Sequence, residues 1–478
     1  MREFKLVFTL IASTLILISC EKDSKIEEGA AYFGGEVVNP RENFVILSKS
    51  KKVLDTVFLD ESNRFLYKVA NMEEGLYTFR LWAAEGLEYQ MVLLEPNDSI
   101  IFRLNTLEFD ESLVYTGRGA RKNNYLINLF LDGEAEDKVV LGYSQLAPHE
   151  FERRLDSIRN HKFNKLKKFN VKNPTSDIFN NLVEGSINYD YYLSKEVYPF
   201  VNYANSERAN FEALPSNFYD FRSEIDYDYS ELMDFFPYYS FLKHHFENMA
   251  LSEHFKKSDD TVLDVKSKNY NLIKLDLIDR LMINDSIKNR LLAQTAFEFI
   301  SKSKNTDEYD EVLNSYTAKN THVENGTYIT EMVSSLKALK TGSFLPEISI
   351  LDYNNRELNL KDVINKPTVL YFWSNTYSSH NDSHKKAEEL KVKYPEVNFI
   401  AIHATTNKQQ EWKSLILKYN YSKDNEFIFK NPELAKQKLA ISPINKVMII
   451  DKKGKIVNAH TNMFSIMFEE ELLGLLNQ

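Results

Sequence analysis

The stretch Thr368-Val369-Leu370-Tyr371-Phe372-Trp373 is a nearly continuous apolar run, and the fold of the C-terminal part of the chain is built around it. An uninterrupted apolar run of this length is typical of a strand that is buried on both faces of a sheet. We therefore expect this strand to lie in the middle of a covered sheet.

The segments after this run alternate between helical and strand patterns. The expected elements are a helix over 385–394, a strand over 397–402, a helix over 409–419, a hairpin over 446–458 and a final helix over 467–476. This order predicts a mixed sheet with helices on both faces, formed by residues 341–478.

Two further regions precede this α/β region. Residues 30–118 contain short alternating runs about 8–12 residues apart, which predict an all-β sandwich or barrel. Residues 119–340 carry apolar residues at helical spacing and predict a helical domain, with helices over 148–168, 178–192, 230–254, 276–303 and 328–339. The sequence thus predicts three domains of different fold class.

Composition excludes several classes of function. The 478-residue chain has a formal net charge of −10 at pH 7, which argues against a nucleic-acid-binding surface. It has 14 glycines and neither a Gly-x-Gly-x-x-Gly nor a Walker motif, so a nucleotide cradle is not expected. The one cysteine, Cys20, excludes an intrachain disulfide and any chemistry that needs two cysteines of the same chain.

The first twenty residues predict where the protein is located. Arg2 and Lys5 precede a short apolar run over 6–18, which is the pattern of a secretory signal peptide. The segment Leu17-Ile18-Ser19-Cys20 resembles the bacterial lipobox, which implies lipidation of Cys20. With the charged segment 21–29 as a tether, we expect a protein anchored in a membrane of the bacterial cell envelope, on the periplasmic face or at the cell surface.

The C-terminal region resembles the thioredoxin fold of the TlpA/ResA-like envelope thiol–disulfide oxidoreductases. In that family the central strand ends in Phe-Trp-Ala-x-Trp-Cys-Pro-Pro-Cys, and this chain has Phe372-Trp373-Ser374-Asn375-Thr376-Tyr377-Ser378-Ser379-His380. Tyr377 and His380 thus occupy the two cysteine positions. The segments 94–100 and 115–120 resemble a small β domain that often precedes a thioredoxin-like domain in envelope lipoproteins.

The activity of that family does not carry over to these residues. Thiol–disulfide exchange needs an attacking thiolate and a resolving thiol, and neither Tyr377 nor His380 provides one. We therefore predict no catalytic residue and no cofactor, and a role in binding or scaffolding exported proteins or peptides.

A peptide-binding rim is implied by the same resemblance. In the family, the residue before a cis-proline offers its backbone to a bound peptide, and Ser442 would take that place before Pro443. The expected rim consists of Trp373, Tyr377, Ser442 and Pro443.

Two alternatives remain open. His380 is expected in the first turn of a helix, where the positive end of the helix dipole favours a neutral imidazole, and His384 lies on the same face. Together with His403, which follows the neighbouring parallel strand, these side chains could bind Zn²⁺ or Cu²⁺. The second alternative is an oxidoreductase subunit whose thiols come from a partner protein.

Overall fold

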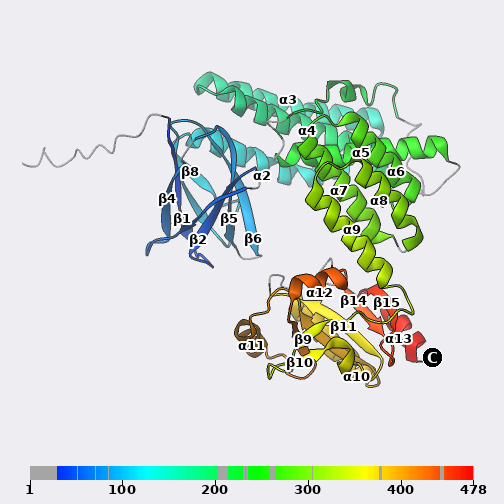
Figure 1. The fold of residues 1–478 in the computed structure, drawn as a ribbon. Coiled ribbons are helices and arrows are strands. Elements are labelled where there is room, and N and C mark those ends of the chain that lie inside the picture. Colours follow the sequence, from blue (N-terminus) through cyan, green and yellow to red (C-terminus); the bar gives the residue numbers. More distant parts are fainter. Residues whose placement is uncertain are drawn as a thin grey trace, which may run out of the picture. The chain divides into compact units, whose positions relative to one another are not determined.

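A computed structural model describes residues 29–50, 52–69, 72–83, 86–202, 214–229, 232, 235–258, 264–303, 305–375, 379–441 and 446–476 (Figure 1). The predicted signal peptide, the tether except Gly29, and the residues Tyr377, Ser442 and Pro443 lie outside these ranges. The chain divides into two compact units, one comprising the residues up to 138 together with 173–183, and the other 139–172 together with 184–478.

The first unit is built on two four-stranded sheets, ordered β4-β1-β7-β8 and β3-β2-β5-β6. The strands are β1 (Ala31–Val38), β2 (Phe44–Lys49), β3 (Lys52–Phe58), β4 (Arg64–Val69), β5 (Gly75–Trp82), β6 (Leu87–Leu94), β7 (Ser99–Asn105) and β8 (Val114–Arg118). Phe33 and Phe102 from one sheet and Phe79 from the other meet in a shared core, with ring centroids 4.8–5.5 Å apart. The predicted all-β region is therefore confirmed.

A buried asparagine joins this sandwich to the helix that follows it. Helix α2 (Ala120–Tyr143) begins directly after β8, and Asn123 on its first turn is buried. The Asn123 amide accepts a hydrogen bond from the backbone N–H of Leu93 at 2.7 Å and donates one to the Leu93 carbonyl at 2.9 Å. Both polar groups of a strand residue are thus satisfied without water.

The second unit contains most of the predicted helical region, whereas residues 119–138 and 173–183 belong to the first unit. Its helices are α3 (Pro148–Lys172), α4 (Asp177–Asn202, which begins in the first unit), α5 (Phe236–Lys257), α6 (Lys268–Leu281), α7 (Asp285–Lys302), α8 (Tyr309–Lys319) and α9 (Val323–Ala338). Among the described residues of the whole chain, no helix is long and apolar enough to cross a membrane.

Several helix boundaries differ from the prediction, and the largest difference lies between 276 and 303. A single helix over 276–303 was expected, but the structure has two, because α6 ends at Leu281 and α7 begins at Asp285. The Asn284 side chain accepts hydrogen bonds from the backbone N–H groups of Ser286 and Ile287 at 3.1 and 3.2 Å. This N-cap starts a new helix inside a pattern that reads as continuous.

The C-terminal part forms a seven-stranded mixed sheet, ordered β10-β9-β13-β12-β11-β14-β15. Its strands are β9 (Ser349–Leu351), β10 (Glu357–Asn359), β11 (Thr368–Trp373), β12 (Asn398–His403), β13 (Glu426–Phe429), β14 (Val447–Ile450) and β15 (Ile456–Thr461). Its helices are α10 (His380–Lys393), α11 (Gln409–Lys418), α12 (Pro432–Lys438) and α13 (Phe468–Leu476). The strands β11, β12 and β13 are parallel, so their C-terminal ends meet at one edge of the sheet.

Both faces of this sheet are covered, as the sequence predicts. Every residue of β11 is buried, and its side chains alternate between two cores. Leu370 and Phe372 pack in the core that includes α12, whereas Val369, Tyr371 and Trp373 pack in the core that includes α10, α11 and α13. The covered mixed sheet is confirmed, and it brings the end of β11 to the first turn of α10.

Candidate functional site

The site is centred on the indole of Trp373, the last residue of β11. Trp373 is directly opposite His403 in the parallel pairing of β11 with β12, and the two ring centroids are 4.4 Å apart in an edge-to-face contact. Only 1% of Trp373 is exposed. Trp373 therefore belongs to the core and offers no surface to the peptide-binding rim that was expected to include it.

The first turns of α10 bring two more imidazoles to the same indole. The ring centroids of His380 and His384 lie 5.6 and 5.1 Å from that of Trp373, and 6.5 Å from each other. Both histidines are buried. The structure thus brings together His380, His384 and His403, which the sequence singled out, around Trp373.

His384 shares a proton with a buried carboxyl group, that of Glu426 at the start of β13. The Nδ1 of His384 donates to the backbone carbonyl of His380 at 2.8 Å, because a carbonyl can only accept. The Nε2 of His384 lies 2.8 Å from Oε1 of Glu426, so a second proton lies between these two atoms. The other carboxyl oxygen of Glu426 accepts a hydrogen bond from the indole N–H of Trp373 at 3.3 Å.

Tyr421 packs against the imidazole of the His384–Glu426 pair. Its ring stacks on His384 with centroids 3.6 Å apart and planes inclined by 5°. Its hydroxyl donates to the side-chain oxygen of Asn381 at 2.7 Å, and the Nδ1 of His380 lies 2.6 Å from the same hydroxyl. The hydroxyl proton points to Asn381, so the imidazole N–H of His380 is the donor in the second bond.

Burial shifts the pKa values of three ionisable side chains in the cluster. It raises the pKa of the Glu426 carboxyl, against the opposing effects of His384 and Trp373. It lowers the pKa of His380, with further contributions from His384 and Lys418. Burial, followed by the nearby His380, lowers the pKa of His403 to about 4. A neutral His380 was predicted, although from the helix dipole rather than from burial.

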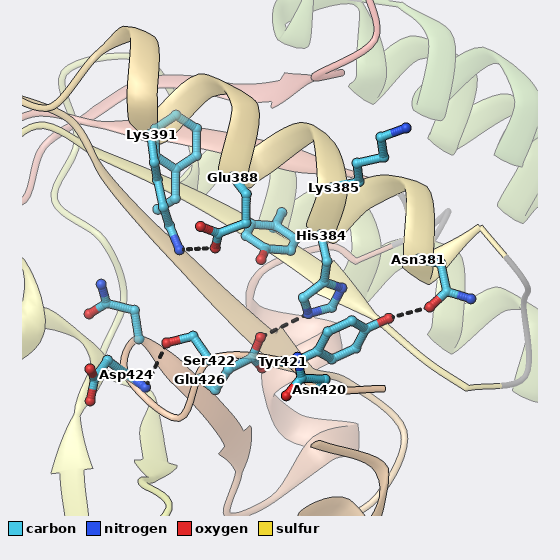
Figure 2. A pocket seen from close by; sticks show the side chains of 13 residues that line it. Asn381, His384, Lys385, Glu388, Lys391, Asn420, Tyr421, Ser422, Asp424 and Glu426 are labelled. Carbon is cyan, nitrogen blue, oxygen red and sulfur yellow. Dashed lines mark hydrogen bonds and ion pairs between the residues drawn. The ribbon is translucent and has the colours of Figure 1, made fainter. Parts of the chain in front are cut away.

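A cavity of about 570 Å³ lies beside the proton-sharing pair (Figure 2). His384 and Glu426 line it while hydrogen-bonded to each other, and Tyr421, bonded to Asn381, lies beside them. Lys385, Glu388 and Lys391 of α10 are among the other residues that line it. This arrangement can hold a proton next to solvent-accessible space, but it contains no nucleophilic sulfur.

The histidine nitrogens are not arranged as a metal shell. The Nε2 of His403 lies 3.3 Å from the side-chain oxygen of Asn375, and its Nδ1 has no hydrogen-bond partner among the described residues. The Nδ1 of His380 is directed at the Tyr421 hydroxyl. The two ring nitrogens of His384 are directed at the His380 carbonyl and at Glu426. Within the described ranges, no group of three or more His, Cys, Asp or Glu side chains could hold a metal ion.

Sequence reasoning missed the two residues that complete the cluster. Glu426 opens the short run Glu426-Phe427-Ile428-Phe429, and Tyr421 lies in the polar loop before it. The apolar run itself is a strand signal, and a glutamate at its buried end would have indicated a paired carboxyl group. Nothing local to Tyr421 indicates that it stacks on an imidazole.

Comparison with known proteins supports the fold of this part of the chain. Residues 365–456 match a family model described as thioredoxin-like, whereas no curated protein matches the chain. The chain is similar to the thioredoxin domain of a thiol-disulfide oxidoreductase from Bacteroides vulgatus, with 22% identity over 25% of this chain and 86% of that chain, at a TM-score of 0.22. It is also similar to a thiol:disulfide interchange protein from Bacteroides sp., with 18% identity over 29% of this chain and 90% of that chain, at a TM-score of 0.24. The family match and the covered mixed sheet together identify a thioredoxin-like domain at the C-terminal end of this chain.

Proposed function

We propose that this protein is a lipid-anchored protein of the bacterial cell envelope whose thioredoxin-like domain binds exported proteins or peptides without exchanging disulfides. The observation that carries the proposal is the composition of the redox motif. The only cysteine is Cys20, and Tyr377 and His380 occupy the two motif positions. His380 is 4% exposed and hydrogen-bonded to Tyr421, so this position is packed rather than reactive.

The anchor is proposed from the first twenty residues. Lipidation of Cys20 after removal of residues 1–19 would place acyl chains at the mature N-terminus, and each buried CH₂ group adds about 0.8 kcal/mol to membrane binding. The charged segment 21–29 would then separate the folded part from the bilayer.

The binding role is proposed from the segment Ile441-Ser442-Pro443-Ile444, which precedes β14. A backbone that offers hydrogen bonds to an extended chain needs no thiol, so this interaction is compatible with the loss of both cysteines. Tyr377 and Ser442 are the proposed contact residues, and the buried Trp373 is excluded from the rim.

The first prediction concerns redox activity. The soluble form from residue 21 onward should leave the rate of insulin reduction by dithiothreitol unchanged, because it has no thiol to form a mixed disulfide. A cysteine-containing thioredoxin serves as the positive control in a turbidity assay. Acceleration by this protein alone would contradict the proposal, and acceleration only in the presence of an envelope thioredoxin-like protein would favour the partner-thiol alternative instead.

A second experiment tests the proposed binding role with a permanently unfolded protein as the probe. Reduced, carboxymethylated lactalbumin should bind to the immobilised protein, whereas native lactalbumin should not. Absence of binding to the unfolded probe would overturn the proposed role.

A further inference from the structure

We propose that a cleft between helices α5, α7 and α9 binds a polypeptide segment that carries a carboxylate beside an aromatic side chain. This inference rests on the proposed function, because it specifies the chemistry of the chain that the protein would bind. The cleft lies in the helical part of the second unit and shares no residue with the cavity of the thioredoxin-like domain.

The shape and lining of the cleft fit side chains of a bound peptide. Its volume is about 620 Å³, which is within the range of about 300–1,000 Å³ that ligand pockets have. Phe236 and Tyr328 line it although 59% and 54% of their surfaces are exposed, and Phe297 contributes a further ring. Exposed aromatic residues around a concave site are characteristic of binding surfaces.

Arg290 on α7 supplies a preorganised cation. The central carbon of its guanidinium group lies 3.5 Å from the centroid of the Tyr239 ring, so the ring covers one face of the group. The Tyr239 hydroxyl donates a hydrogen bond to the side-chain oxygen of Gln294 at 2.6 Å, which holds the ring in place. A stacked guanidinium group still has N–H groups at its edge, and these match the two oxygens of a carboxylate.

The charges around Arg290 leave it available for a ligand. The two other basic side chains that line the cleft have partners within the protein. The Nζ of Lys243 lies 3.7 Å from Oε1 of Glu298, and the Nδ1 of His244 lies 2.8 Å from Oε2 of Glu247. Arg290 contacts Tyr239 by stacking and by a side-chain hydrogen bond, and it forms no ion pair with a carboxylate in the part of the chain that the structure describes. A carboxylate from the ligand is the group that completes its hydrogen bonding, and the adjacent rings select an aromatic neighbour.

The test compares two blocked peptides by calorimetric titration of the form from residue 21 onward. One is N-acetyl-alanyl-phenylalanyl-aspartyl-alanine amide, and the other has asparagine in place of aspartate. We expect the aspartate peptide to bind about tenfold more tightly or better, because hydrogen bonds to charged groups are stronger than neutral ones. Arg290→Gln should remove this preference, and Arg290→Lys should reduce it, because lysine keeps the charge but loses the planar fork.

Arg280→Gln is the matched control, because Arg280 is an exposed arginine on the neighbouring helix α6 and does not line the cleft. Equal binding of the two peptides, or an equal loss of preference in Arg280→Gln, would overturn the inference. Binding of free 3-phenylpropionate through Arg290 without binding of either peptide would identify a small carboxylate as the ligand and would also overturn it. If unfolded lactalbumin binds but the two peptides do not differ, this inference fails while the proposed function stands.

Discussion

Replacing Glu426 with leucine is expected to lower the free energy of unfolding of the thioredoxin-like domain by about 3–5 kcal/mol. Leucine keeps most of the side-chain volume but removes both carboxyl oxygens. His384 Nε2 and the Trp373 indole N–H would then remain buried without their partners. Leaving such groups unpaired is more destabilising than the net contribution of the hydrogen bonds themselves.

Glu426→Gln is the control for this prediction. The glutamine amide can donate to His384 Nε2 while its oxygen accepts from the Trp373 indole, so both bonds survive without a titratable group. We expect it to be less destabilising than leucine by at least about 2 kcal/mol. Urea unfolding followed by the fluorescence of Trp373 and Trp412, in a Trp82→Phe background, measures both variants. Equal stability of the leucine and glutamine variants would show that the buried pair contributes little.

The second large effect is a loss of stability in acid that depends on His403. Burial lowers the pKa of this imidazole from its ordinary value of 6.5 to about 4 in the folded protein. Between these two pH values the unfolded chain binds a proton that the folded protein does not, so stability is lost as the pH falls from about 6.5 to about 4. The difference between the two pKa values corresponds to about 3 kcal/mol.

His403→Phe should remove this part of the acid sensitivity. Phenylalanine keeps an aromatic ring against Trp373 but cannot be protonated, so its unfolding free energy should fall less steeply than that of the wild type across this pH window. His380 and His245, whose pKa values burial also lowers, and Glu426, whose pKa burial raises, titrate in both proteins. The difference between wild type and variant therefore isolates His403.

The measurement is urea unfolding at a series of pH values between 4 and 7. The matched control is His149→Phe, which removes an exposed imidazole of α3 and adds the same ring. Parallel pH profiles for the wild type and His403→Phe would contradict the account of His403 as a neutral buried group. An equal change in the pH dependence of the unfolding free energy of His149→Phe would show that the loss of any histidine, exposed or buried, has this effect.

The sequence by itself determined the classes of the three regions and the course of the central sheet. Strands such as Thr368–Trp373 and the strand ending at His403 are recognisable because burial on both faces requires an unbroken apolar run. Their parallel pairing then brings the ends of the two strands to one edge, which is why Trp373 and His403 were expected together. That the chain has one cysteine, and so cannot form an intrachain disulfide, likewise needs no structure.

The sequence pattern predicted a wrong helix boundary where the apolar periodicity and a helix-capping residue compete. The apolar periodicity over 276–303 continues through Met282 and Ile283, so the pattern predicts one helix. The structure ends α6 at Leu281 and starts α7 after the Asn284 cap, because a side chain that satisfies two backbone N–H groups favours a new helix start.

Only the tertiary structure decided the composition of the site. A glutamate at position 426 is 42 residues from His384, and in a sequence with 69 acidic residues it reads as one more surface charge. Trp373, expected at a binding rim, proves to be the core residue around which the imidazoles pack. Side-chain pairing of this kind depends on which strand and helix surfaces face each other. The periodicity of a segment determines which of its faces is buried, but not which side chains it meets there.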